Sequence, residues 1–184
     1  MKRLFVALLA MLMLGGSSVA AVTAQDATPD ISDLAGDSGE GNPVDPAIGD
    51  TIVFYDENGN PAGNATVQSI ERGWEDYDEY YEPEDGTEYV AFVITVESTI
   101  ARGAIDVEDY DFNLQTASGS FWGTSYASSE TAEPPLLEDT VSLATGDSEE
   151  FTVVFQVYEG EQLAHLFWQP DSGVLLTIAN LEDE

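Results

Sequence analysis

The sequence predicts an all-β protein, a sandwich of about eight strands, and three observations lead to this fold class. Short runs in which apolar and polar residues alternate recur along the chain, and they are rich in β-branched and aromatic residues. Clusters of Gly, Pro, Asn and Asp, the residues of turns, separate these runs. No segment shows the spacing of an amphipathic helix, and only residues 161–166 suit a single helical turn. Strands joined by turns bury their apolar faces by packing one sheet against another.

The strongest strand signal is Thr87–Ser98, "TEYVAFVITVES". Its alternate positions from Val90 to Val96 are all apolar, and those between them are mostly apolar too. We therefore expect a central strand with both faces partly covered. Across the domain, the residues that we expect to be buried are Val90, Phe92, Ile94, Val96, Phe112, Phe155 and Val157.

Weaker signals mark the other strands. A turn at Pro170–Gly173 divides the last pair, and Pro134 with Pro135 places "ETAEPPLLEDT" in a loop, because proline cannot sit inside a sheet. The remaining expected strands are Thr51–Tyr55, Ala65–Gly73, Tyr110–Thr116, Ser120–Ala127, Val141–Leu143, Glu150–Tyr158 and two within residues 163–181.

The first residues are typical of a secretory signal peptide, which we expect to span residues 1–24. Two basic residues precede the apolar run Leu4–Leu14, which is too short for the roughly 20 residues that span a bilayer. Residues 25–47 are rich in Asp, Gly, Pro and Ser and predict a disordered acidic linker, so that the folded domain occupies residues 48–184. We expect a secreted protein, extracellular or in the cell envelope, with no transmembrane segment in the mature chain; retention of the apolar run as an anchor is the alternative.

The charge is strongly negative, with 36 acidic residues against 4 basic ones. Nucleic acid is excluded as a partner, because phosphate is bound by Lys and Arg. An anionic membrane surface is excluded for the same reason. The charge favours solubility and affinity for cations. It indicates either a solvated acidic surface or selective cation binding.

Three sequence features together suggest a family. They are a Gly-x-x-Tyr-Val opening to the central strand, an aromatic-then-Leu strand before Ser-Gly, and a Gly before the penultimate long strand. The residues are Gly86, Tyr89, Val90, Phe112, Leu114, Ser118, Gly119, Gly146, Phe155 and Val157. With them, the stretch from Ile48 to Leu181 resembles a family of exported bacterial immunoglobulin-like domains of unassigned function, sometimes labelled as telomeric-repeat-binding-factor-like. The resemblance implies an immunoglobulin-like antiparallel β-sandwich and export, and it brings no catalytic residues. Many members carry a lipid-anchored N-terminal Cys, which this chain lacks.

Few catalytic chemistries remain open to this composition. The chain has no Cys and a single histidine, His165, so the usual zinc and copper ligand sets cannot form. A Ser-His-Asp triad through His165 is formally possible, but its alternation with Leu166 and Trp168 favours a solvent-facing strand residue. The stretch Asp56–Val67 begins like a calcium loop but lacks the central Gly and the final Glu, and it favours a hairpin turn. We therefore expect no enzyme.

The stretch "GWEDYDEYYEPEDG", Gly73–Gly86, is the candidate site, with seven carboxylates and four aromatic rings. Clustered carboxylates suit calcium, which takes six to eight oxygen ligands, and calcium is the one cofactor that we consider. The candidate metal ligands are Asp76, Asp78, Glu79, Glu82 and Asp85. Exposed Tyr and Trp are common interface anchors, so the candidate interaction residues are Trp74, Tyr77, Tyr80 and Tyr81. We expect the rings to fold back over the sandwich while the carboxylates remain in water.

Three functions follow from these observations, in order of preference. The first is an exported, non-catalytic binding or interaction module whose partner is an unknown protein or envelope component. The second is a structural envelope domain stabilised by a cation such as calcium. The third is a carbohydrate-active enzyme, which would use two of the carboxylates and stack sugars on the rings.

Overall fold

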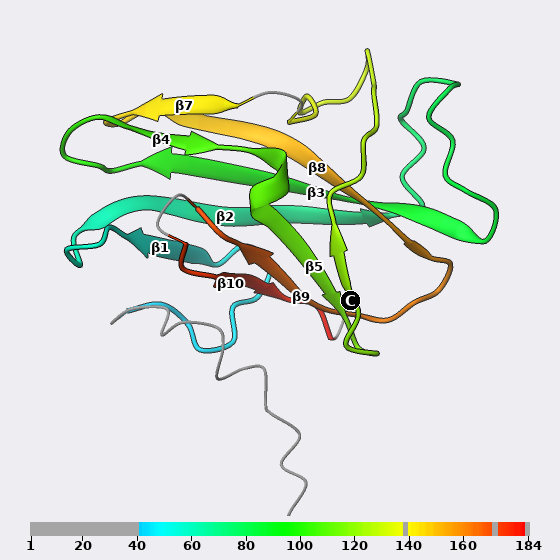
Figure 1. Cartoon of the computed structure of the whole chain (residues 1–184), viewed down its shortest axis with the longest axis horizontal. Coiled ribbons are helices and arrows are strands. Elements are labelled where there is room, and N and C mark those ends of the chain that lie inside the picture. The colour runs from blue at the N-terminus through cyan, green and yellow to red at the C-terminus, as the bar shows by residue number, and fades with distance from the viewer. Residues whose placement is uncertain (1–40, 138–139, 171–172, 183–184) are drawn as a thin grey trace, which may run out of the picture. The chain divides into compact units, whose positions relative to one another are not determined.

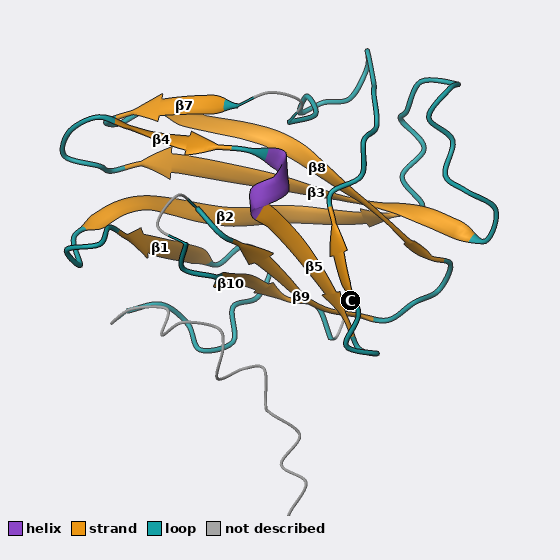
Figure 2. Cartoon of the chain, viewed as in Figure 1, coloured by secondary structure: helices purple, strands orange, loops and turns teal. Residues whose placement is uncertain are grey.

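The computed structural model describes residues 41–137, 140–170 and 173–182. The expected signal peptide and most of the expected linker lie outside these residues. The described part is built almost entirely from antiparallel strands, with one short 3-10 helix at Asp109–Asp111 (Figure 2). The all-β prediction is therefore confirmed.

Two four-stranded sheets form the sandwich (Figure 1). In spatial order, the first sheet contains β1 (Thr51–Tyr55), β2 (Pro61–Arg72), β3 (Thr87–Ser98) and β8 (Ser148–Tyr158). The second contains β10 (Leu176–Asn180), β9 (Leu163–Trp168), β5 (Phe112–Thr116) and β6 (Phe121–Gly123). A separate two-stranded sheet pairs β4 (Ala104–Val107) with β7 (Val141–Ala144).

This strand order is immunoglobulin-like. In such sandwiches, strands A, B and E share one sheet, while C, F and G share the other, with a further strand beside C in variable-type domains. Here β2, β3 and β8 are adjacent in the first sheet, as A, B and E are. The order β10-β9-β5-β6 matches G, F, C and the additional strand. Strand β1 extends the first sheet beyond β2.

The core lies between the two main sheets and consists of aliphatic and aromatic side chains. All seven residues expected to be buried are fully buried. Phe92 of β3 packs edge-to-face on Phe155 of β8, with ring centroids 5.7 Å apart. Phe112 of β5 stacks on Trp168 of β9 at 6.2 Å. The period-2 pattern of β3 thus identified the core face correctly.

Several boundaries differ from expectation, and tertiary pairing explains the main ones. No helical turn forms at residues 161–166, the one segment suited to it: β9 begins at Leu163, where a strand is expected, and pairs with β5, which buries Leu166 against the core. Strand β4 was not anticipated, because only four residues pair with β7. Strand β6 ends at Gly123, earlier than expected, and the chain then runs along the edge of β8. The described residues contain ten strands where about eight were expected.

Both outer edges of the first sheet form hydrogen bonds to neighbouring segments, along β8 and at one residue of β1, and such bonds oppose pairing with other chains. On β8, the amide N–H groups of Ser125 and Leu137 donate to the carbonyls of Val154 and Thr152, at 2.7 and 3.0 Å. On β1, the side-chain amide of Asn42 bonds both the N–H and the C=O of Val53, at 2.7 and 2.8 Å. Asn42 belongs to residues 41–47, the part of the expected linker that the structure describes. This part is hydrogen-bonded to the sandwich.

Arg72 and Glu88 join the ends of β2 and β3 in an ion pair. Arg72 also donates to the Glu161 carbonyl at 2.9 Å, and the Glu88 carboxylate accepts from the Gly160 N–H at 3.0 Å. Partial burial acts to raise the pKa of Glu88, but the bonds from Arg72 and Gly160 and the Arg72 charge lower it below its usual value of 4.5.

We expect Glu88→Gln to lower the free energy of unfolding by about 1–2 kcal/mol near pH 7. Because folding lowers the pKa of Glu88, its stabilisation is present above pH 4.5 and is lost as the pH falls through the folded-state value. The variant and the original protein should therefore converge in stability in acid. Urea unfolding at pH 7 and at acid pH measures this. Glu71→Gln, at an exposed position on the neighbouring strand β2, is the control; an equal loss in both variants at pH 7 would contradict the prediction.

Candidate functional site

The Gly73–Gly86 loop and the segment 124–137, together called the loop pair, lie side by side at one end of the first sheet (Figure 1). The Asp78 N–H donates to the Ser128 carbonyl at 2.8 Å, and the Tyr81 and Tyr126 rings meet edge-to-face at 5.5 Å. Gly73 and Gly86 end the loop with φ angles of 63° and 83°, a backbone conformation that favours glycine. The loop is therefore fixed both at its ends and across to its neighbour.

Two of the loop's rings form a second, smaller apolar cluster on the outer face of the first sheet. Trp74 is only 6% exposed and packs with Tyr89, Ala91, Ala127 and Val154. Tyr77 packs against it, with its ring 6.0 Å from Trp74 and 5.5 Å from Tyr89. Burial, and secondarily the charge of Tyr77, raises the pKa of Tyr89. The expectation that the rings fold back over the sandwich is confirmed for Trp74 and Tyr77.

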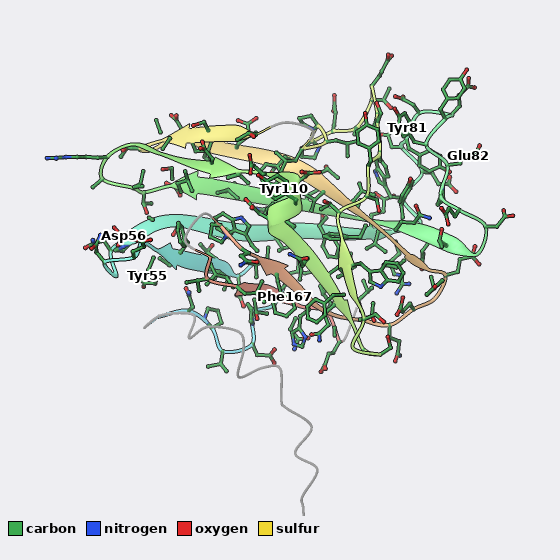
Figure 3. All side chains as sticks on the ribbon, viewed as in Figure 1. Tyr55, Asp56, Tyr81, Glu82, Tyr110 and Phe167 are labelled. Atoms are coloured by element: carbon green, nitrogen blue, oxygen red, sulfur yellow. The ribbon has the colours of Figure 1, made fainter. Side chains whose placement is uncertain are left out.

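The other tyrosines of the loop pair lie outward. Tyr80 is 86% exposed and Tyr126 is 81% exposed, while Tyr81 is half-buried against Tyr126. Figure 3 shows Tyr81 and Glu82 in the part of the loop that projects beyond the sheet. The four candidate interaction residues thus divide into an anchoring pair and a surface pair. Sequence reasoning misses Tyr126, because the pattern of "SFWGTSYA" predicts one strand, whereas the chain leaves the sheet after Gly123.

The five candidate metal ligands do not gather into one cage. Asp78 accepts from the Ser128 hydroxyl at 2.9 Å and from the Glu130 N–H at 3.4 Å, and Asp76 accepts from the Thr131 hydroxyl. Glu79, Glu82 and Asp85 are exposed. Within the described part of the chain, no three His, Cys, Asp or Glu side chains are placed to hold a metal ion. Two of the carboxylates thus join the loop to its neighbour, and calcium binding stays a prediction.

We expect added salt to raise the thermal midpoint of unfolding, because ions screen the repulsion among 36 acidic residues within a Debye length of about 10 Å at 0.1 M. Screening depends on ionic strength alone, whereas a calcium site saturates. Melting in calcium, magnesium and sodium chloride at matched ionic strength distinguishes the two effects. Equal shifts are the expected result. A saturable gain with calcium alone, lost in Asp76→Asn with Asp78→Asn, would instead establish a site.

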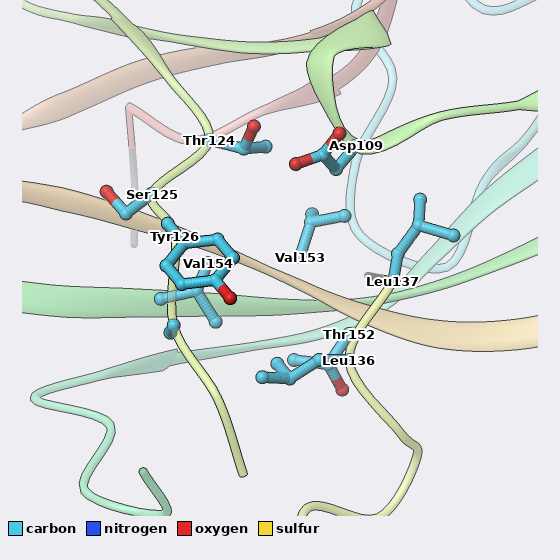
Figure 4. Close-up of a pocket in the computed structure, with 10 residues that line it drawn as sticks. Asp109, Thr124, Ser125, Tyr126, Leu136, Leu137, Thr152, Val153 and Val154 are labelled. Atoms are coloured by element: carbon cyan, nitrogen blue, oxygen red, sulfur yellow. The ribbon is translucent and has the colours of Figure 1, made fainter. Parts of the chain in front are cut away.

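A small hollow of about 40 Å³ lies beneath Tyr126, between the segment 124–137 and β8 (Figure 4). The Asp109 carboxylate points toward Thr124 at its rim, as Figure 4 shows. Burial, and secondarily the charge of Glu108, raises the pKa of Asp109. The volume suits a few water molecules rather than a substrate.

The two other motifs of the sequence have structural roles. Nδ1 of His165 lies 3.2 Å from the amide oxygen of Gln115, and its ring leans on Phe167, so His165 is a half-buried strand residue. Asp56 accepts from the backbone N–H groups of Asn58 and Asn60 at 2.9 and 2.8 Å, and these bonds to Asn60 and Asn58 lower its pKa. Residues 56–60 form the β1–β2 hairpin turn, as expected, and the rest of the stretch belongs to β2.

Comparison with solved structures shows the same fold in two proteins. MPT63, a secreted protein of Mycobacterium tuberculosis, matches with a TM-score of 0.53 and 17% identity over 74% of this chain and 97% of its own. The putative lipoprotein YcdA of Bacillus subtilis matches with a TM-score of 0.51 and 17% identity over 67% of this chain. The match spans 38% of the YcdA chain, so the larger part of that protein has no counterpart here.

Sequence comparison adds no family. No protein-family model matches the chain, and no curated protein matches it. The residues that the structure describes include no helix of sufficient length and apolarity to cross a membrane.

Proposed function

We propose that the chain is an exported, non-catalytic binding module that contacts its partner through Tyr80, Tyr81 and Tyr126. The observation that carries this proposal is the exposure of Tyr80 and Tyr126 on loops that are otherwise anchored. Large rings on a fixed backbone lose little entropy on binding, and tyrosine is a frequent anchor of interfaces. The partner is a protein or another component of the cell envelope.

Export is supported by the basic and apolar start of the sequence and by the nature of the two structural neighbours, one secreted and one a putative lipoprotein. The charge of the loop pair restricts the partner. Because Glu79, Glu82 and Asp85 surround the tyrosines in the sequence and are exposed, the partner surface is neutral or basic.

The test compares retention of envelope components by the mature protein and by Tyr80→Ser with Tyr126→Ser. We expect at least about a tenfold loss of affinity, since each interface tyrosine contributes on the order of 1–2 kcal/mol. Tyr110→Ser, an exposed tyrosine of the 3-10 helix outside the loop pair, is the matched control and should retain the partner. Unchanged retention in the double variant would refute the proposed surface.

A further inference from the structure

A second and larger hollow lies beside the loop pair, between β6 and the end of β8. Its volume is about 300 Å³, at the lower end of the range for small-molecule sites. The residues that line it are Glu84, Thr87, Trp122, Gly123, Ser125, Gln156 and Tyr158. One of them, Glu84, belongs to the Gly73–Gly86 loop, so that loop contributes an acidic residue to the lining.

Two aromatic rings form a corner of this hollow. Trp122 of β6 and Tyr158 of β8 are nearly perpendicular, at 83°, with ring centroids 5.4 Å apart. In an edge-to-face pair, one ring keeps both faces uncovered by the other, and an aromatic face carries negative charge density. Trp122 packs on the core, while Tyr158 is 61% exposed. The core therefore holds the Trp122 ring in place, whereas the Tyr158 ring is accessible to a ligand.

The polar groups of the hollow include hydrogen-bond acceptors. The Gln156 side-chain N–H donates to the Thr87 hydroxyl at 2.8 Å, and that hydroxyl donates to the Glu84 carbonyl at 2.6 Å. This chain of bonds orients the Gln156 amide and joins it to the rim. Its carbonyl oxygen and the Glu84 carboxylate can then accept hydrogen bonds from a ligand. The Ser125 hydroxyl accepts a hydrogen bond from the Gln156 backbone N–H at 2.8 Å, which holds Ser125 beside β8.

The charge of the site selects the ligand's sign. Among the residues that line the hollow, one is acidic and none is Lys, Arg or His. The molecule carries 36 acidic residues against 4 basic ones, and Arg72 is paired with Glu88. An anion would be repelled, whereas a cation gains from the field, from the Glu84 carboxylate and from the aromatic faces.

From this geometry we propose that the hollow binds a small organic ammonium ion, with its charged nitrogen against Trp122 and Tyr158 and its charge balanced by Glu84. The proposal rests on the proposed function only in treating the chain as a binding module, since it uses none of the three surface tyrosines. A free amine and a lysine side chain share the required chemistry. A neutral sugar could also stack in such a corner but would gain nothing from the charge.

The experiment titrates the mature protein with n-butylammonium chloride at constant ionic strength and follows the Trp122 indole N–H by ¹H–¹⁵N NMR. We expect a saturable shift with a dissociation constant on the order of millimolar. n-Butanol, the uncharged analogue, and glucose should leave the resonance in place. Equal shifts with butanol, a shift with glucose alone, or a response that sodium reproduces would each overturn the proposal.

Matched variants assign the residues. Glu84→Gln should weaken butylammonium binding about three- to tenfold, whereas Glu82→Gln makes the same charge change outside the hollow and should leave it unchanged. Tyr158→Leu should weaken binding by a similar factor, and Tyr80→Leu should not. Equal effects within either pair would refute the assignment. The folded state of each variant is checked by its remaining amide spectrum.

Two further comparisons identify the source of the ligand and distinguish binding in the hollow from binding through the surface tyrosines. Equal binding of Nα-acetyl-lysine methylamide and butylammonium would assign a lysine side chain, and binding of butylammonium alone would assign a free amine. The variant Tyr80→Ser with Tyr126→Ser should lose its partner yet still bind butylammonium. The failure of one proposal is thereby distinguishable from the failure of the other.

Discussion

Phe92→Ala is expected to lower the free energy of unfolding by about 3–5 kcal/mol, because it removes a fully buried ring from the centre of the sandwich. Phe92 lies on β3, which has a neighbouring strand on each side, and its ring packs against Phe155. The surrounding strands are held by ladder hydrogen bonds and cannot collapse into the space. Much of a typical domain's stability of 5–15 kcal/mol would be lost.

Urea unfolding followed by circular dichroism measures this effect. Phe92→Leu, which keeps most of the volume, should recover more than half of the loss. Phe121→Ala is the control, since that ring is half exposed on the short edge strand β6. A loss below about 1 kcal/mol in Phe92→Ala would mean that the ring is not at the centre of a packed core.

Trp74→Ala is expected to cost about 2–4 kcal/mol and to release the Gly73–Gly86 loop from the sheet. Trp74 connects the loop to Tyr89, Ala127 and Val154, and so holds both members of the loop pair. The expected cost is lower than for Phe92, because the cluster is small and lies on the outer face of the sheet.

Limited proteolysis with a glutamyl endopeptidase measures the release, since the loop holds several glutamates. We expect cleavage within residues 73–86 to accelerate in Trp74→Ala under conditions in which the sandwich stays folded. Tyr80→Ala, in the same loop but 86% exposed, should be cleaved at the original rate. If Trp74→Ala is also cleaved at the original rate, the loop is held by the Asp78 bonds rather than by the indole ring.

The path of the segment 124–137 explains why the proposed binding residues lie at the edge of β8. The segment 124–137 covers the open edge of β8 with backbone hydrogen bonds and at the same time carries Tyr126 to the surface. An edge that needs covering therefore also supplies a rigid support for an exposed ring. The same part of the chain lines the hollow between β6 and the end of β8, since Trp122, Gly123 and Ser125 lie where the chain passes from β6 to the edge of β8.

The sequence by itself determined the fold class, the core and the acidic character of this protein. The alternation in Thr87–Ser98 is a local property, because side chains along a strand alternate between faces, and it identified both the bounds of β3 and its buried face. The turn residues around Asp56 likewise specified a hairpin through bonds within the same few residues. The prediction that the rings of the Gly73–Gly86 loop fold back over the sandwich is confirmed for Trp74 and Tyr77, because large rings gain from burial wherever a sheet face is near. It is wrong for Tyr80, which is 86% exposed.

Only the tertiary structure decided which groups meet across the chain. Asp76 and Asp78 lie in one acidic run, but their partners are Thr131 and Ser128, some fifty residues away, and nothing local specifies that pairing. The sequence predicts a strand from residue 163 but not its neighbours, and only the folded chain shows that β9 pairs with β5 and β10 and buries Leu166. Tyr126 acquires its place from the path of the chain between β6 and β8, and Tyr158 of β8 meets Trp122 of β6 only in the folded sandwich. Long-range pairing sets that path, since the sheet edge must be covered and the period of a strand carries no information about which strand lies beside it.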